Sequence, residues 1–474
     1  MDSDYRNIGT LEKFKDFIKN KSISVIGIAR SNIPLIEFLQ KCGVEKITAR
    51  DKNKDIEKTF DIKYILGDNY LDDLCEDIIF KTPAIRRDLP QLINAQNNGS
   101  IITSEMELFF MLCPAKTIAI TGSEGKTTTT TIIGEILKSA GKTVYVGGNI
   151  GEPLLNKIEN ITKNDYAVLE LSSFQLFDLD NNNFKPDYAV IVNITPNHLD
   201  WHKDMEEYAN AKKIIYKNQK DSDRLVLSFD NDITRNIKNN AYFFSKNILP
   251  NDYKNGVYCD GETIFVRENR IEKKSMNKND IFIKGEHNVW NFMAAIGVTH
   301  DIAGNEAIIN VAKNFGGVPH RIEFIRELDG IAYYNSSIDS SPTRTIAALN
   351  YFDYLQKEKK IIVILGGSDK KISFDPLAPV VYKKAKAAIL YGATKEKIKQ
   401  CFDDYKNNFV GDGVPDVPHM HINIAENFDS AVMTAKSLAD SGDIVLLSPA
   451  CASFGEFKDF EERGNRFKEL VKGF

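Results

Sequence analysis

Short apolar segments recur all along this chain, and polar stretches of helix length separate them. From Lys21 to Ser104 the apolar segments are SISVIGI, EKITARD, IKYILGD, EDIIFKTP and GSIITS, with helical stretches such as NIPLIEFLQKCG between them. This alternation is typical of parallel sheets in which a helix connects one strand to the next. The pattern therefore predicts an α/β protein.

Two further series of apolar segments follow. After Glu105 they are TIAITG, TVYVGG, YAVLELSS, YAVIVNIT and LVLSFD, and after Gly317 they are IIVILGG, KAAILYG, HINIA and DIVLLSP. Most are apolar along their whole length, as expected where helices cover both faces of a sheet. The last segment, FEERGNRFKELVKGF, is predicted to be a helix.

At roughly 150 residues per domain, a chain of 474 residues suggests about three domains. We expect them at residues 1–104, 105–316 and 317–474, each with a mostly parallel sheet and flanking helices. The first is expected to be Rossmann-like, the second P-loop ATPase-like and the third dinucleotide-fold-like. Asp260-Gly261 within VYCDGETIFV predicts a hairpin, and hence a small antiparallel annex on the second sheet. Residues 285–303 are predicted to form one amphipathic helix.

Charge and composition narrow the classes of partner. The chain has 61 basic and 66 acidic side chains and no run of five or six like charges, so a nucleic-acid partner is not expected. The stretch MDSDYRNIGTLEKF lacks the basic-then-apolar order of a signal peptide, and no apolar run approaches the roughly 18 residues of a membrane span. The scattered cysteines favour free thiols in a reducing cytoplasm over a zinc site or disulfides. They are Cys42, Cys75, Cys113, Cys259, Cys401 and Cys451.

The stretch TIAITGSEGKTTTTTII has features of a phosphate-binding loop. Gly122 and Gly125 are too close together for the usual P-loop pattern. Nevertheless, an apolar strand ends at the first glycine and a helix is expected to begin near Lys126, which would present unpaired N–H groups to an anion. Lys126 would reach the outer phosphates, and Thr127 or Thr128 could place a hydroxyl on Mg²⁺. The alternative is an ordinary Gly-Lys turn before a threonine-rich segment.

Three other places carry possible indications of a ligand site. The turn from Gly27 to Asn32 keeps only the first glycine of a dinucleotide fingerprint, so it favours a capped strand-to-helix turn over an NAD site. His198 follows the apolar segment YAVIVNIT, at the strand end where open α/β sheets bind ligands. Asn288 and Asn291 are three residues apart and would share a helix face, although Asn288 could instead cap the helix.

Taken together, these motifs resemble those of the Mur ligases, which build the peptide of bacterial cell-wall precursors. Residues 122–128 resemble their shortened ATP loop, 169–176 their metal-binding glutamate segment and 193–200 their substrate-side histidine segment. Residues 208–212 resemble the Y-x-x-A-K helix with its carbamylated lysine, and 285–291 with 319–321 resemble the adenosine-binding motifs. The string SPACASF, followed by Phe457, Phe460 and EERGNRF, is specific to the member that adds D-glutamate to UDP-N-acetylmuramoyl-L-alanine.

The resemblance implies a reaction in cytoplasmic peptidoglycan-precursor synthesis. ATP would phosphorylate the alanyl carboxylate, and the amine of D-glutamate would attack the acyl phosphate. Implied catalytic residues are Lys126, His198 and Lys212, and implied ligands of Mg²⁺, in two ions, are Thr127, Glu170, His198 and Lys212 as a carbamate. Implied ATP contacts are Gly122, Ser123, Glu124, Gly125, Lys126, Thr127, Thr128, Asn288, Asn291, His320 and Arg321.

The other substrates would have their own residues. For the nucleotide sugar, the resemblance implies Ser31, Asn32, Thr82, Asn149, Ser172, Gln175 and His198. For D-glutamate, whose carboxylates need converging cationic and N–H donors, it implies Ser340, Lys370, Ser453, Phe454 and Phe460. A monomer is expected.

Several positions depart from the commonest form of the family, among them Glu124, Asn197 and the segment Asn335-Ser336-Ser337-Ile338.

Three alternatives remain open. A sister ligase with another amino-acid substrate is disfavoured by SPACASF and by the chain length. A P-loop nucleotide-binding protein without ligase activity would not explain why His198, Lys212 and Ser453 occur together. A dehydrogenase is disfavoured by the degraded fingerprint at Gly27.

Overall fold

The computed structural model describes residues 2–28, 32–151, 153–180, 184–237, 241–352, 361–370, 372–409 and 420–474. Ser31, expected to contact the nucleotide sugar, lies outside the described residues. The chain forms two compact units, Met1–Phe315 and Gly316–Phe474, and each is described by itself. The three-way division expected from the sequence stays a prediction. None of the described helices is long and apolar enough to cross a lipid bilayer.

The first sheet of the first unit is entirely parallel, in the order β3-β2-β1-β4-β5. Each apolar segment expected before Ser104 supplies one of its strands. These strands are β1 (Ser22–Ile26), β2 (Lys46–Asp51), β3 (Lys63–Leu66), β4 (Ile78–Lys81) and β5 (Ile101–Thr103). The accompanying helices are α1 (Asp2–Arg6), α2 (Leu11–Ile18), α3 (Asn32–Lys41), α4 (Pro90–Asn97) and α5 (Glu105–Leu112).

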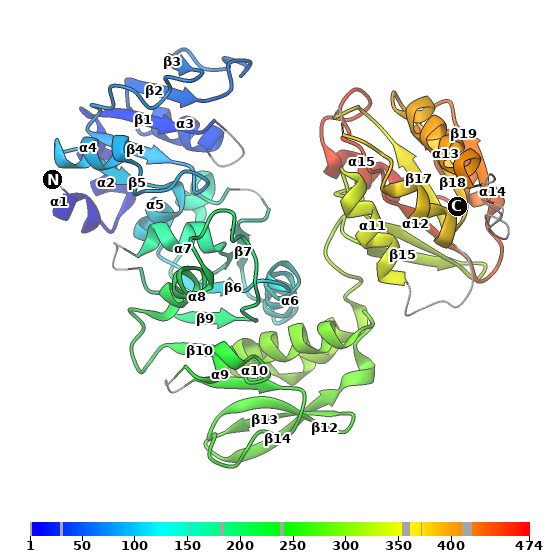
Figure 1. Ribbon diagram of the computed structural model, residues 1–474. Helices are drawn as coiled ribbons and strands as arrows, with labels where there is room; N and C mark the ends of the chain where they lie inside the picture. Colours follow the sequence, from blue (N-terminus) through cyan, green and yellow to red (C-terminus); the bar gives the residue numbers. More distant parts are fainter. Residues whose placement is uncertain are drawn as a thin grey trace. The chain divides into compact units, whose positions relative to one another are not determined.

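The second sheet has the order β14-β13-β12-β11-β10-β9-β6-β8-β7 and is parallel from β7 to β12. Its strands are β6 (Lys116–Thr121), β7 (Val144–Gly148), β8 (Tyr166–Glu170), β9 (Tyr188–Ile191), β10 (Arg224–Ser228), β11 (Tyr242–Ser245), β12 (Gly256–Asp260), β13 (Thr263–Glu268) and β14 (Ile271–Asn277). The expected hairpin is confirmed, because β12 pairs antiparallel with β13, and β14 extends it (Figure 1). The sequence analysis did not identify β11.

Helices line both faces of this second sheet. They are α6 (Lys126–Ser139), η1 (Leu155–Asn160), α7 (Ser173–Leu179), α8 (Met205–Lys213), η2 (Ile214–Tyr216), α9 (Asp232–Arg235), η3 (Lys278–Asp280) and α10 (Glu286–Asn314). α6 packs against α10 (Figure 1). α10 runs further than expected from the sequence, and Gly304 interrupts it with φ 76° and ψ 166°. Glycine tolerates this backbone, so the helix changes direction there and resumes.

The two sheets of the first unit share a hydrophobic core. α3 and α5, which belong to the first sheet, both pack against η1 from the second. As a result, one buried cluster includes Leu35 and Leu39 of α3, Leu155 and Ile158 of η1, and Leu169 of β8. Continuous burial of apolar surface is the main force holding such layers together, and here it joins the two sheets into one unit.

The second unit is built on a sheet of order β15-β16-β20-β17-β18-β19, parallel except for the pair β15–β16. Its strands are β15 (Glu323–Leu328), β16 (Ile331–Asn335), β17 (Ile361–Gly366), β18 (Ala385–Tyr391), β19 (His421–Ile424) and β20 (Ile444–Leu447). Its helices are α11 (Pro342–Tyr351), α12 (Leu377–Lys384), α13 (Lys395–Phe409), α14 (Phe428–Leu438) and α15 (Phe460–Lys472). The last helix is where the sequence predicts it. β15 and β16 were missed.

Arg463 on α15 lies fully buried inside this second unit. Its guanidinium donates to Ser337 Oγ at 3.0 Å, to Ser337 O at 2.9 Å and to the carbonyl oxygens of Cys451 at 3.1 Å and Ala452 at 3.2 Å. The Arg463 side chain therefore links α15 by hydrogen bonds to the end of β16 and to the loop after β20.

Replacing Arg463 with alanine is expected to lower the free energy of unfolding of the second unit by about 3 kcal/mol, because several buried carbonyl oxygens would lose a charged donor. Arg466→Ala on the same helix is the matched control. Arg466 forms exposed ion pairs with Asp429 and Glu469, so its loss should cost at most ~1 kcal/mol. Urea titrations of both variants test the difference, and equal losses would contradict the role assigned to Arg463.

Candidate active site

The glycine-lysine loop connects β6 to α6. Gly125 caps α6 with φ 77°, a conformation that favours glycine, and an added Cβ there would lie 2.5 Å from Asn291 Oδ1. The backbone N–H groups of Ser123 and Glu124 donate to Asn193 Oδ1 at 3.0 and 2.9 Å. The loop is therefore fixed by a side chain from the end of β9, and the Glu124 side chain is exposed.

Thr127 and Asn149, both predicted from the sequence as site residues, contact Glu170, the last residue of β8. Thr127 Oγ donates to Glu170 Oε2 at 2.7 Å, and Asn149 Nδ2 donates to Glu170 Oε1 at 2.9 Å. They come from the first turn of α6 and from the end of β7. Because β6, β7 and β8 are neighbouring parallel strands, their carboxyl ends deliver these side chains to one edge of the sheet.

Lys126 and Lys212 both donate to the carbonyl oxygen of Gly122, at 2.8 and 2.7 Å. Lys212 comes from α8 and is only 1% exposed, with its Nζ 4.6 Å from the centre of the Tyr208 ring. Burial and the positive charge of Lys126 together lower the pKa of Lys212 to about 6, while Glu170 opposes the shift. At pH 7 the Lys212 amine is therefore largely neutral.

His198 lies in the loop between β9 and α8 and has the positive φ of 54°. Its ring centre is 5.0 Å from that of Phe174 and 6.4 Å from that of Tyr208. Partial desolvation lowers the pKa of His198, Asp200 opposes the shift, and the positive charge of Lys126 adds to it. Asn197 accepts a hydrogen bond from the His198 backbone N–H.

The other predicted nucleotide-sugar residues have partners within the fold. Asn32 Nδ2 donates to the carbonyl oxygens of Ile26 at 3.1 Å and Gly27 at 2.9 Å, at the carboxyl end of β1. The Thr82 backbone N–H donates to Ile26 O at 2.9 Å, which places Thr82 beside the same turn. Ser172 and Gln175 form a capping box that begins α7, directly after Glu170 and Leu171.

The predicted adenosine residues of the first unit lie on the buried face of α10 that packs against α6. Asn291 Oδ1 accepts from Thr129 Oγ at 3.3 Å, and Asn291 Nδ2 donates to Asn288 Oδ1 at 3.4 Å. Asn288 Nδ2 also donates to Lys284 O at 2.8 Å. Both amides therefore lie close to the start of α6, and Thr128 is partly exposed in its first turn.

In the second unit, His320 is buried and Arg321 is exposed. The His320 ring lies 3.0 Å from Asn335 Nδ2, and its backbone N–H donates to Glu323 Oε2 at 2.8 Å. Burial lowers the pKa of His320. Its ring centre is 6.0 Å from that of Phe460 at the start of α15.

Two loops of the second unit bring predicted D-glutamate residues to one edge of its sheet. The Ser368 backbone N–H donates to Ala452 O at 2.9 Å, which joins the loop after β17 to the loop after β20. Lys370 Nζ donates to Ser340 Oγ at 3.0 Å. Ser453 is buried, whereas the Phe454 ring is 65% exposed.

The donors around Glu170 fit a magnesium ion and nucleotide phosphates. Among the described residues, no three His, Cys, Asp or Glu side chains gather into a metal-binding group. A hard cation here would instead use Glu170, the Thr127 hydroxyl and oxygen atoms brought by the nucleotide or by a modified lysine, a set that suits Mg²⁺.

The structure also reveals contacts that the sequence analysis missed. Arg86, in the loop after β4, donates to both carboxylate oxygens of Glu207 on α8 at 3.1 Å and to Trp201 O at 3.0 Å. Asn193, which fixes the glycine-lysine loop, begins the histidine segment 193–200, but the sequence did not indicate this role. Local sequence patterns carry no indication of such long-range pairs.

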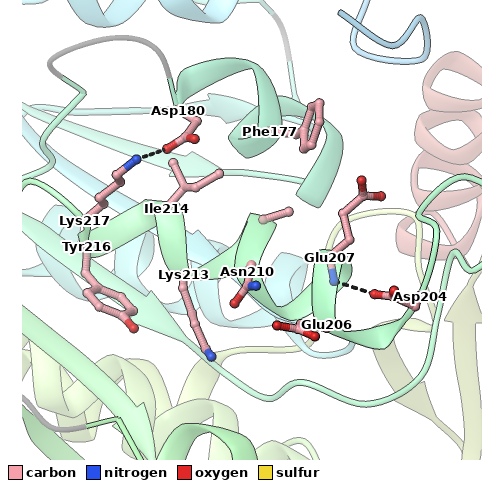
Figure 2. Close-up of a pocket in the computed structure, with 11 residues that line it drawn as sticks. Phe177, Asp180, Asp204, Glu206, Glu207, Asn210, Lys213, Ile214, Tyr216 and Lys217 are labelled. Atoms are coloured by element: carbon pink, nitrogen blue, oxygen red, sulfur yellow. Dashed lines mark hydrogen bonds and ion pairs between the residues drawn. The ribbon is translucent and has the colours of Figure 1, made fainter. Parts of the chain in front are cut away.

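A pocket of about 730 Å³ lies on the outer side of α7, α8 and η2 (Figure 2). Its lining mixes acidic residues with lysines and two aromatic rings. The lining residues are Phe177, Asp180, Asp204, Glu206, Glu207, Asn210, Ala211, Lys213, Ile214, Tyr216 and Lys217. Asp180 pairs there with Lys217, and Asp204 caps α8 at the Glu207 backbone N–H. Asp180, Asp204 and Glu207, which pairs with Arg86, therefore already have partners in the fold.

Comparisons with known proteins agree with these motifs. The family model of the Mur ligase middle domain matches residues 120–299, and the Mur ligase glutamate ligase domain matches residues 320–451. A protein of Clostridium acetobutylicum named UDP-N-acetylmuramoylalanine–D-glutamate ligase is 48% identical over 97% of this chain and 98% of its own length. The protein of the same name from Acetivibrio thermocellus is 46% identical with the same coverage.

Solved structures support the fold. The ligase MurC of Thermotoga maritima has a TM-score of 0.51 at 18% identity, covering 96% of this chain and 100% of that protein. MurF of Acinetobacter baumannii has a TM-score of 0.52 at 14% identity, covering 95% and 90%. At such identities these structures support the α/β fold alone. With the family models and the near full-length relatives, they establish that this chain belongs to the Mur ligase family.

Proposed function

We propose that this protein is an ATP-dependent carboxylate–amine ligase that adds D-glutamate to UDP-N-acetylmuramoyl-L-alanine in peptidoglycan-precursor synthesis. Support comes from relatives that carry this activity in their names, at 45–48% identity over nearly the whole chain. The structural observation that carries the proposal is the convergence of Thr127 and Asn149 on Glu170 beside the glycine-lysine loop.

The reaction requires that a poor leaving group be activated. ATP would transfer its terminal phosphoryl group to the alanyl carboxylate, and the free amine of D-glutamate would then displace phosphate to form the amide. Transfer between two anions needs positive charge and in-line positioning. We assign the positive charge to Lys126, whose Nζ already lies against the loop carbonyls of Gly122 and Ser123.

Mg²⁺, when bound, would neutralise negative charge on the phosphates. We assign Thr127 and Glu170 as protein ligands of the first ion, and His198 with a modified Lys212 as ligands of a second. The present Thr127–Glu170 hydrogen bond keeps both oxygen atoms together. Asn149 would orient the Glu170 carboxylate from its other side.

We further propose that Lys212 is carbamylated. A neutral amine can add to CO₂ to give a carbamate and release one proton, whereas a protonated amine cannot. Burial keeps the pKa of Lys212 at about 6, so the reactive form dominates at pH 7. The modification would place an anion beside the Lys126 ammonium in place of a neutral amine, and it would supply oxygen atoms for a metal.

The remaining assignments concern the other substrates. The phosphates of ATP would contact Gly122, Ser123, Glu124, Gly125 and Thr128 of the loop. Its adenosine would contact Asn288 and Asn291 on α10, and His320 with Arg321. The nucleotide sugar would contact Ser31, Asn32, Thr82, Asn149, Ser172, Gln175 and His198. D-glutamate would use Lys370, Ser340, Ser453, Phe454 and Phe460, and the hydrogen bond from Lys370 to Ser340 supports a shared pocket for two of them. We expect a cytoplasmic monomer, and light scattering of the purified protein tests the oligomeric state.

Phosphate release from ATP in the presence of UDP-N-acetylmuramoyl-L-alanine is expected only when D-glutamate is added. L-alanine, a diamino acid and a dipeptide serve as competing amines. Release with one of these but not with D-glutamate would identify a sister ligase, and no release with any of them would favour a nucleotide-binding protein.

Lys126→Ala should lower the rate by about 10²-fold, since it removes the charge beside the transferred phosphoryl group.

Lys212→Ala is expected to lose about 10²-fold or more of the rate and to regain part of it with a short carboxylic acid, which would replace the missing carbamate. Lys213→Ala is the matched control, because Lys213 follows on the same helix but lines the outer pocket. Labelling with ¹³C-bicarbonate should give a carbamate signal in the parent and in Lys213→Ala but not in Lys212→Ala. An unmodified Lys212 in the active parent would refute the assignment.

A further inference from the structure

Arg86 lies where the loop after β4 meets the segments that carry His198 and Lys212. Its guanidinium is held by Asp88 of its own loop, through Nε at 2.9 Å and Nη2 at 2.8 Å. The same group reaches both carboxylate oxygens of Glu207 and the carbonyl oxygen of Trp201. It also lies over two rings, with its central carbon 4.7 Å from the centre of the Trp201 ring and 5.1 Å from that of Phe177.

The contact between the two segments is reciprocal. Trp201 Nε1 donates to Ala84 O at 3.0 Å, so the histidine loop binds back to the loop that presents Arg86. A guanidinium that binds a carboxylate with two parallel bonds and also stacks on rings fixes both distance and orientation. Arg86 is therefore geometrically constrained on each side.

The histidine loop needs such an anchor. His198 occupies the left-handed region at φ 54°, and a non-glycine residue persists there only when its surroundings hold it. Phe174 packs against the rings of His198, Trp201 and His202 at centre distances of 5.0, 4.5 and 5.7 Å. Trp201 thus connects Arg86 to the packing around His198.

Because Glu207 belongs to α8, its bonds to Arg86 also fix the position of this helix. Its carboxylate also accepts from the Lys203 backbone N–H at 2.9 Å, and His202 Nδ1 lies 3.5 Å away. In Figure 2 the Glu207 side chain extends towards the end of the pocket where Phe177 lies. The next residue on α8, Tyr208, is hydrogen-bonded through its hydroxyl to Ser123 Oγ at 2.9 Å, and Lys212 on the same helix reaches Gly122.

We propose that Arg86 is a positioning residue for the ligase reaction: it holds the loop of His198 and the helix of Lys212 in register with the loop that follows β4. This inference rests on the proposed ligase function. Arg86 would act through Trp201 and Glu207, without touching substrate. Thr82, assigned to the nucleotide sugar, lies in the same loop as Arg86, so the arginine aligns the substrate-side loop with the catalytic lysine.

Arg86→Met, which keeps the length of the side chain but not its donors, is expected to lower kcat by about 10-fold or more, since small displacements of catalytic groups are costly. The KM values for all three substrates should change less than about threefold. Arg86→Lys should recover only part of the loss, because an ammonium cannot reproduce the bidentate geometry. A raised KM for the nucleotide sugar with unchanged kcat would overturn the proposal in favour of direct substrate contact.

Two matched controls separate positioning from general stability. Arg224 in the same unit also binds a carboxylate with two bonds, to Asp301 at 2.8 Å, and stacks on Tyr242, so Arg224→Met should destabilise comparably but keep kcat. Glu206→Gln changes the neighbouring acid of α8 and should leave kcat unchanged, whereas Glu207→Gln should match Arg86→Met. If Arg86 and Glu207 act as one unit, the rate of the double variant should lie within about threefold of the rate of the slower single variant. A rate loss equal to the product of the two single losses would refute this.

A readout independent of activity distinguishes failure of this inference from failure of the proposed function. The chain has two tryptophans, so in a Trp290→Phe background the fluorescence reports on Trp201. Arg86→Met should make Trp201 more accessible to acrylamide, and Arg224→Met should not. Unchanged quenching would show that Arg86 does not hold the loop, even in a preparation without ligase activity. If the parent protein releases no phosphate but quenching still increases in Arg86→Met, only the proposed function is refuted.

Discussion

The carbonyl oxygen of Gly122 accepts hydrogen bonds from two lysines, Lys126 and Lys212, and the chemistry of the first unit depends on this arrangement. Two ammonium groups this close repel each other strongly in a buried environment. The molecule relieves the repulsion through burial of Lys212, whose amine is largely neutral at pH 7. One cation is thereby left at the loop, together with one amine that is available for modification.

The sequence predicts those parts of the site that follow from strand ends. β6, β8 and β9 are largely apolar, so their positions in a parallel sheet could be inferred. That Thr127 and Glu170 act together was implied by the family resemblance, and the structure brings the two side chains within hydrogen-bonding distance. The pairing of Arg86 with Glu207 could not be inferred, because 121 residues separate them and neither lies in a periodic pattern. Likewise, β15 and β16 carry mixed polar and apolar residues and were missed, since their pairing depends on contacts with β20 and α15.

The segment that departs most from the family pattern has a structural role in this protein. Asn335 binds the His320 ring, and Ser337 receives the Arg463 guanidinium and donates to Phe460 O. Asp339, next in the chain, accepts from Ser448 Oγ, and burial raises the pKa of its carboxyl to about 6. Asn335, Ser337 and Asp339 therefore belong to a connected, buried polar network between β16, β20 and α15.

Buried charges also fix the first sheet on the second. Lys81, the last residue of β4, pairs with Asp178 of α7 at 2.5 Å, and Arg87 binds Glu107 and the Asp178 carbonyl oxygen close by. Burial lowers the pKa of Lys81 and raises that of Asp178 to about 6, so each charge is costly and is retained through the other. Apolar side chains could hold these layers together, but they would allow sliding. Hydrogen-bonded charges permit one alignment, as the proposed phosphoryl transfer from a nucleotide on the second sheet to a substrate on the first would require.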